Sequence, residues 1–103
     1  MKYELAPRFA ADWARLSESE RQLFRRVVYG AFVPACERKL ADPSAAWPAS
    51  LRVRAVASAP GIWEMTWSHS GPDGRATFEW IRLGSEPGIR WRRIGGHAIF
   101  DEP

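Results

Sequence analysis

Apolar residues in the first part of the chain recur every three or four positions, which is the period of an amphipathic helix. Phe9, Trp13 and Leu16 share one face at these spacings and predict a short helix. Before it, Lys2–Leu5 reads as a short strand that ends at Pro7, because proline has no amide hydrogen to donate. The chain is therefore expected to start with a strand followed by a helix.

A second helix is expected to begin near Ser17, because Ser17 and Glu20 have the spacing of a capping box. Its apolar stripe consists of Leu23, Val27 and Ala31, flanked by Phe24, Val28 and Phe32. Proline lacks a backbone donor and disfavours a helical conformation in the residue before it. We therefore expect a kink or a break at Pro34, followed by a final helical turn over Ala35–Leu40.

After a loop at residues 42–50, the helical period gives way to the alternation of strands that place one face on a core. Alternating runs cover residues 51–55, 62–67, 76–81 and 89–94. Turn sequences connect these runs, and the connections are too short for the crossovers of parallel strands. We predict one α+β domain over residues 1–103: a short N-terminal strand, two helices and a four-stranded antiparallel meander forming one curved sheet. Helices on one face would leave the other face partly open for function.

The basic charge of the chain comes almost entirely from arginine. Lysine occurs only at Lys2 and Lys39, while Lys and Arg together number 15 against 12 acidic residues, a formal net charge of +3. The guanidinium group is a planar fork that suits phosphate oxygens and stacks on bases. Locally concentrated arginine thus favours a nucleic-acid surface. A genome that prefers arginine codons explains the composition equally well.

The single cysteine, Cys36, excludes an internal disulfide and a multi-cysteine zinc site. Nothing in the sequence calls for a metal or an organic cofactor, so we expect none. The first residues lack the apolar core of a signal peptide, and no apolar run has the length of a membrane span. We expect a cytoplasmic protein with no membrane partner.

Three segments carry a resemblance to a known family. They are YELAPRFAADWARL at the start, RVRAVASAPGIWEMTW in the middle, and DGRATFEW followed by WRRIGGHAIF at the end. In this order and spacing they resemble the RelE/ParE superfamily of toxins from bacterial type II toxin–antitoxin systems. The resemblance covers most of the chain. It implies a RelE/ParE-like fold and a cognate antitoxin protein that buries the basic face of the sheet.

This superfamily carries two activities on one fold, so the fold does not separate them. RelE, YoeB and HigB relatives cut messenger RNA on the ribosome, whereas ParE relatives inhibit DNA gyrase by binding to it. The first expectation from the resemblance is a metal-independent, ribosome-dependent mRNA endoribonuclease that inhibits translation. The alternatives are a ParE-like gyrase inhibitor and a non-catalytic RelE-fold binding protein.

Metal-free RNA cleavage needs a base for the ribose 2′-hydroxyl, a cation for the phosphate and an acid for the leaving 5′-oxygen. Arg75 matches the functional arginine of similar toxins, and its alternative role is a surface arginine at a hairpin end. His97 matches the late histidine of YoeB-like enzymes and is the acid–base candidate, although it could simply cap the last turn. RelE-like enzymes place a tyrosine near the end, where this chain has Phe100, which can stack on a base but transfers no proton.

Glu64 and Arg93 complete the catalytic candidates. Glu64 could act as the general base in the manner of the YoeB glutamate, although that glutamate lies on the preceding strand. Strand alternation places Arg93 on the face opposite Arg90 and Arg92. Arg93 is therefore expected either to form a salt bridge or to face the site through a bulge that shifts the register.

The candidates for RNA binding are arginines of the predicted strands and one aromatic residue: Arg52, Arg54, Arg90, Arg92 and Phe100. Arg52 and Arg54 point away from the core face of the predicted strand at 51–55. They could hold an RNA backbone or receive an acidic antitoxin segment. A solvated strand face is the alternative interpretation.

Overall fold

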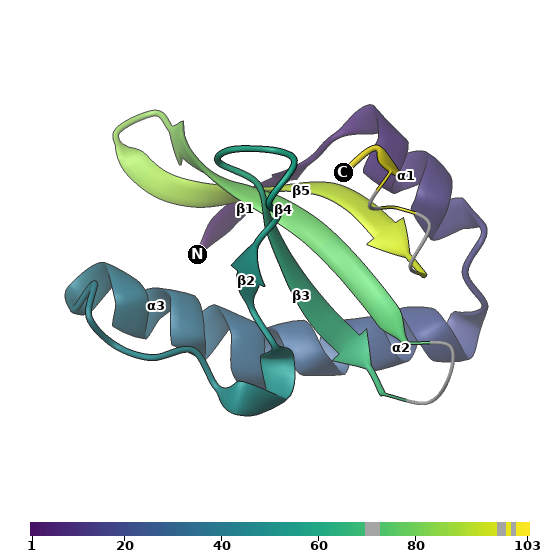
Figure 1. Ribbon diagram of the computed structural model, residues 1–103, viewed down its shortest axis with the longest axis horizontal. Coiled ribbons are helices and arrows are strands. Elements are labelled where there is room, and N and C mark those ends of the chain that lie inside the picture. The colour runs from purple at the N-terminus through teal and green to yellow at the C-terminus, as the bar shows by residue number, and fades with distance from the viewer. Residues whose placement is uncertain (70–72, 97–98, 100) are drawn as a thin grey trace.

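A five-stranded sheet organises this α+β fold, seen in a computed structural model that describes residues 1–69, 73–96, 99 and 101–103 (Figure 1). The strand order is β1-β5-β4-β3-β2. The strands are β1 (Lys2–Leu5), β2 (Arg54–Ala55), β3 (Trp63–Ser68), β4 (Gly74–Leu83) and β5 (Glu86–Gly95). The predicted antiparallel meander of β2 to β5 is confirmed. The sheet as a whole is mixed, however, because β1 pairs in parallel with β5.

The helices are α1 (Pro7–Ala14), α2 (Glu18–Val27), a π-helical turn (Val28–Phe32) and α3 (Val33–Ala41). The capping box at the start of α2 is confirmed: the Glu20 amide donates to Ser17 Oγ at 3.2 Å, and the Ser17 amide donates to Glu20 Oε1 at 2.8 Å. Within the described ranges, no helix has the length and apolar character needed to cross a membrane.

The break predicted at Pro34 does not occur, because the π-helical turn accommodates the proline. Val33 is helical, and its amide donates to the carbonyl of Val28, five residues earlier. Pro34 then lies in the first turn of α3, where a missing amide hydrogen leaves no helical bond unmade. The helix therefore continues to Ala41 and is longer than the single turn expected.

The strand predicted at residues 51–55 is wrong in most of its length. Ala49–Leu51 form a 3₁₀ turn, and Arg52 adopts a left-handed conformation with φ of 47°. This conformation interrupts the alternation of side chains, so only Arg54–Ala55 pair with β3. Leu51 is buried by the turn, whereas Ala55 is exposed.

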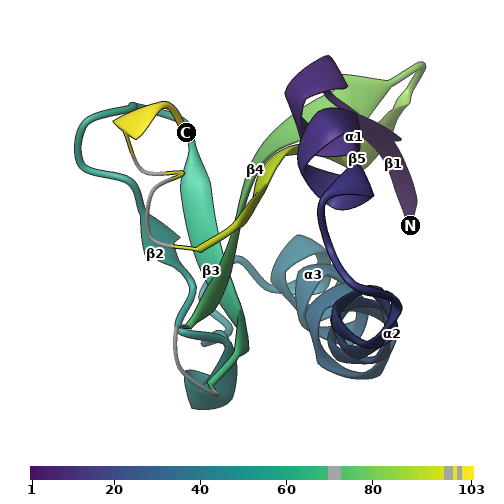
Figure 2. The same cartoon turned by 90° about the vertical axis from the view of Figure 1, so that its right-hand side faces the viewer.

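The helices cover one face of the sheet, and the core lies between the two layers (Figure 2). Aromatic rings fill much of this space. Phe32 lies 4.9 Å from Phe78 and 5.0 Å from Trp91 between ring centroids, and Phe24 lies 5.2 Å from Trp91. The edge-on contacts of Phe32 with Phe78 and of Phe24 with Trp91 add to the stability that burial supplies.

The pairing of β3 with β4 is irregular at the start of β4, and there the Trp67 ring packs against Gly74. The register between β3 and β4 shifts between Thr66 and Ser68, and the indole N–H of Trp67 donates to the carbonyl of Arg75 at 3.0 Å. A Cβ on Gly74 would lie 2.6 Å from the indole ring. Only glycine therefore allows the ring to lie so close to the strand.

We expect Gly74→Ala to destabilise the protein by about 1–3 kcal/mol, because the added methyl group forces the Trp67 ring or the strand to move. Urea unfolding followed by tryptophan fluorescence measures the change. Gly30→Ala is the matched control: nothing lies within 4 Å of the added atom, and alanine should stabilise this helical position by up to about 1 kcal/mol. Equal stabilities of the two variants would contradict this packing argument.

Candidate active site

Four polar side chains form a square on the sheet face away from the helices. Glu64 lies opposite Thr77, and Thr66 lies opposite Arg75, in the pairing of β3 with β4. All four residues are buried, with exposed fractions of 6% or less. This part of the face is therefore closed, whereas Arg90 and Arg92 on the same face remain partly exposed, so the partly open face that was expected is found only beside the square.

Arginines from two strands flank the Glu64 carboxylate. Arg54 Nε donates to Glu64 Oε1, and Arg75 Nη1 lies 3.6 Å from the same oxygen. Asp73 adds a second carboxylate, 3.2 Å from Arg75 Nη2 and 3.6 Å from Arg52 Nη1. The structure thus brings together the predicted residues Arg52, Arg54, Glu64 and Arg75, with a carboxylate and a guanidinium side by side in a buried setting.

The hydroxyl of Thr66 lies in the same square. Thr66 is 1% exposed, and its Oγ1 has no hydrogen-bond partner among the described residues. A buried hydroxyl without a partner is costly, so such a group often marks a place where a ligand or a water binds. Sequence reasoning missed both threonines, although they alternate with apolar positions as Glu64 and Arg75 do.

Arg90 and Arg92 belong to a second group, on strands β5, β4 and β1. Arg90 donates to Glu4 and, at 2.9 Å, to Glu79 Oε1, while Arg92 Nη1 donates to Glu79 Oε2 at 2.7 Å. The shared carboxylate places both arginines on the face predicted for them. Their charges are already balanced by carboxylates, so a phosphate would have to compete with Glu4 and Glu79.

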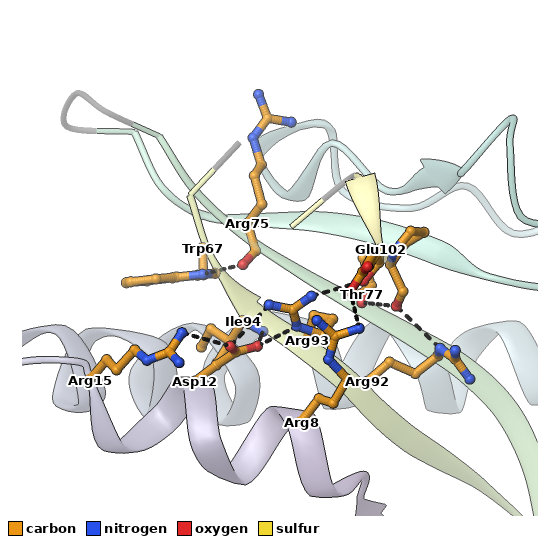
Figure 3. Close-up of polar contacts among 11 residues, drawn as sticks. Arg8, Asp12, Arg15, Trp67, Arg75, Thr77, Arg92, Arg93, Ile94 and Glu102 are labelled. Atoms are coloured by element: carbon orange, nitrogen blue, oxygen red, sulfur yellow. Dashed lines mark hydrogen bonds and ion pairs between the residues drawn. The ribbon is translucent and has the colours of Figure 1, made fainter. Parts of the chain in front are cut away.

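Arg93 forms the salt bridge that was one of the two expectations, and the bulge that was the other also occurs. The register of β4 with β5 shifts so that Phe78 pairs with Trp91 and Thr77 with Arg93, which leaves Arg92 as an extra residue. The bulge brings Arg93 beside Thr77 rather than to the opposite face. Its guanidinium then turns to α1, where Nε and Nη2 donate to Asp12 at 2.6 and 3.1 Å (Figure 3).

Asp12 also accepts the backbone N–H of Ile94 at 3.1 Å. Burial alone would raise the pKa of Asp12, but the hydrogen bonds from Arg93 and Ile94 and the charges of Arg93 and Arg15 hold this pKa below its usual value. Figure 3 shows the Arg75 side chain pointing away from Asp12 and Arg93. We conclude that Arg93 is a positioning residue that fixes α1 to β5.

Sequence reasoning did not identify Asp12, although the sequence holds a signal for it. Asp12 falls within the apolar stripe of Phe9, Trp13 and Leu16, at a position where the helix faces the protein. A carboxylate in such a stripe is buried with a partner far more often than alone.

The remaining candidates, His97 and Phe100, lie outside the described residues. Among the residues that are described, no group of three His, Cys, Asp or Glu side chains could together hold a metal ion.

We expect Asp12→Asn to lower the free energy of unfolding by ~3 kcal/mol at neutral pH, because it removes the charge that balances a largely buried guanidinium. The pKa of Asp12 is lowered in the folded state, so its contribution is complete above its ordinary value of 3.8 and is lost as the pH falls through the folded-state pKa. Urea unfolding at several pH values should show the difference between wild type and variant shrinking below about pH 4.

Glu37→Gln, at an exposed position of α3, is the control for this measurement and should leave stability nearly unchanged. A difference between wild type and Asp12→Asn that stayed constant down to pH 2 would show that the Asp12 charge does not hold the two elements together.

Comparison of the chain with protein-family models, curated proteins and solved structures finds no match. The chemistry of the site must therefore carry any statement about function.

Proposed function

We propose that this protein is a ribosome-dependent mRNA endoribonuclease of the RelE/ParE type, the toxin of a toxin–antitoxin pair. The observation that carries the proposal is the pairing of Glu64 with Arg75 at 3.6 Å, inside a square completed by two threonines. A carboxylate and a guanidinium at this separation can act on the same phosphodiester. The carboxylate can accept the proton of the nucleophile, and the guanidinium can stabilise the negative charge on the phosphate.

In the proposed reaction Glu64 accepts the proton of the ribose 2′-hydroxyl, and the 2′-oxygen attacks the adjacent phosphorus. Arg75 stabilises the negative charge that develops on the phosphate oxygens. The bond from phosphorus to the 5′-oxygen then breaks, which leaves a 2′,3′-cyclic phosphate and a 5′-hydroxyl. His97 is proposed to supply the proton to the leaving oxygen. The buried Thr66 hydroxyl can donate a hydrogen bond to the substrate.

A protein partner is part of this proposal, and the surface offers a place for one. An apolar groove of about 610 Å³ lies between β1, α1 and α2. Tyr3, Leu5 and Tyr29 border this groove and are 56%, 49% and 66% exposed. Large exposed apolar side chains around a groove are typical of a protein interface, so we place the antitoxin there and not over the charged face of the sheet.

One observation favours the alternative, a toxin that binds a protein such as gyrase and cuts no RNA. Arg90 and Arg92 are balanced by Glu4 and Glu79, and Arg54 is balanced by Glu64. A surface of alternating charges suits a protein partner better than a polyanion, which binds where positive charge is in excess.

Primer extension on a defined messenger in a cell-free translation reaction tests the proposal. Wild-type protein should create new 5′ ends only on messengers that are being translated. Arg75→Ala should slow cleavage by roughly 10²–10³-fold, and Glu64→Gln by roughly 10²–10⁴-fold. Arg26→Ala, at an exposed position of α2, is the matched control and should cut like wild type.

Each variant must first show a wild-type circular dichroism spectrum and a cooperative melt, because Arg75 and Glu64 are buried. Intact messenger in the presence of folded wild-type protein would remove the endoribonuclease proposal. Inhibition of gyrase supercoiling by the same sample would then support the protein-binding alternative.

A further inference from the structure

The described residues after Gly96, which are Ile99 and Asp101–Pro103, lie against the sheet face that carries the candidate site. Figure 2 shows the C-terminal end of the chain on the side of the sheet away from α2 and α3. The hydroxyl of Thr77 and the Nε–H of Arg92 both donate to the carbonyl oxygen of Pro103, at 3.0 and 3.2 Å (Figure 3). Two donors from neighbouring strands thus converge on one oxygen.

This C-terminal segment, of which Ile99 and Asp101–Pro103 are described, has further attachments before Pro103. Arg93 Nη1 donates to the carbonyl of Glu102 at 2.9 Å, and Arg8 on α1 forms an ion pair with the Glu102 carboxylate. Ile99 is 5% exposed and rests on Gly95, where a Cβ would lie 3.1 Å from Ile99 Cγ2. Ile99, Glu102 and Pro103 therefore each hold the segment in place, against the sheet or α1.

The two donors that meet at Pro103 have the chemistry of a phosphate site. A hydroxyl and a guanidinium N–H are the donors that proteins commonly direct at phosphate oxygens. Thr77 is fully buried and lies directly opposite Glu64 in the sheet, so its hydroxyl is next to the proposed base. A buried hydroxyl needs a partner, and here the chain's own carbonyl supplies it.

We propose that Thr77 and Arg92 form a subsite for a phosphate oxygen of the RNA backbone, and that the Pro103 carbonyl of the C-terminal segment occupies this subsite until RNA displaces it. This inference rests on the proposed function. It accounts for the burial of Thr77, whose hydroxyl donates to this segment in the free protein. Substrate and segment then compete, so the apparent affinity for RNA falls with the fraction of molecules in which the segment is seated.

The ion pair between Arg8 and Glu102 allows the segment to be loosened without touching the sheet. Its side chains are 57% and 65% exposed and lie outside the square of polar residues. Arg8→Glu places two negative charges together and should lift the segment. Arg26→Glu makes the same charge change at an exposed position of α2 and is the control.

Binding of a short single-stranded RNA with methylated 2′-hydroxyls, followed by fluorescence anisotropy, tests the inference on the full chain. Arg8→Glu should bind this RNA about two- to fivefold more tightly than wild type, although it removes a positive charge. Arg26→Glu should bind equally or more weakly. Thr77→Val should weaken binding roughly tenfold, and Thr77→Ser, which keeps the hydroxyl, should restore it.

The direction of the Thr77→Val effect separates the two roles that Thr77 could have. If Thr77 only held the segment, its loss would free the site and tighten RNA binding, and this result would overturn the subsite. Equal binding by Arg8→Glu and Arg26→Glu would overturn the competition. In both cases RNA binding by the wild type would leave the proposed function intact. Absence of RNA binding by every folded variant, including Arg8→Glu, would overturn the proposed function together with the inference.

Discussion

The geometry of the end of β5 depends on the contacts that the Asp12 carboxylate makes with Arg93 and Ile94. Strand β1 accompanies β5 only as far as Trp91, and the Ala6 amide makes the last bond of that edge. Beyond this point α1 takes the place of a strand, and Asp12 accepts the amide of Ile94. The same carboxylate holds the Arg93 guanidinium that the bulge has turned towards it. Without this contact, the part of β5 that carries Arg92 would be an unsupported edge.

The site is a set of charges that compensate one another. Each of the predicted strand arginines has a carboxylate neighbour, and Arg75 and Arg90 have two each. For a nucleic acid to bind, its phosphates must replace carboxylates that already make good hydrogen bonds. The net binding free energy is then the difference between two similar interactions and not the full strength of a new one. The chain as a whole shows the same near-equality of basic and acidic residues, with a net charge of only +3.

Local patterns predicted what is locally determined. The capping box at Ser17 and the alternation of β3 and β4 depend on neighbours in sequence, and both were predicted correctly. The alternation predicted for β5 is correct only as far as Arg92, because the bulge moves Arg93 to the polar face and Ile94 to the core. The partner of Arg93 lies 81 residues away on α1, and no spacing rule reaches that far. The left-handed Arg52 also had no local signal, since arginine rarely adopts that conformation. Thus the arginines of this face could be named from the sequence, but of the carboxylates that neutralise them only Glu64 could.

The π-helical turn has a consequence for the phase of the long helical segment. Phe24, Val28, Phe32 and Cys36 are all buried at intervals of four residues. In a regular α-helix with 3.6 residues per turn, positions four apart drift by about 40° at each step, or about 120° over this series. The π-helical turn at Val28–Phe32 contains one extra residue, which offsets about 100° of this drift. A repeat of four that no straight helix could keep on one side thereby faces the sheet from end to end.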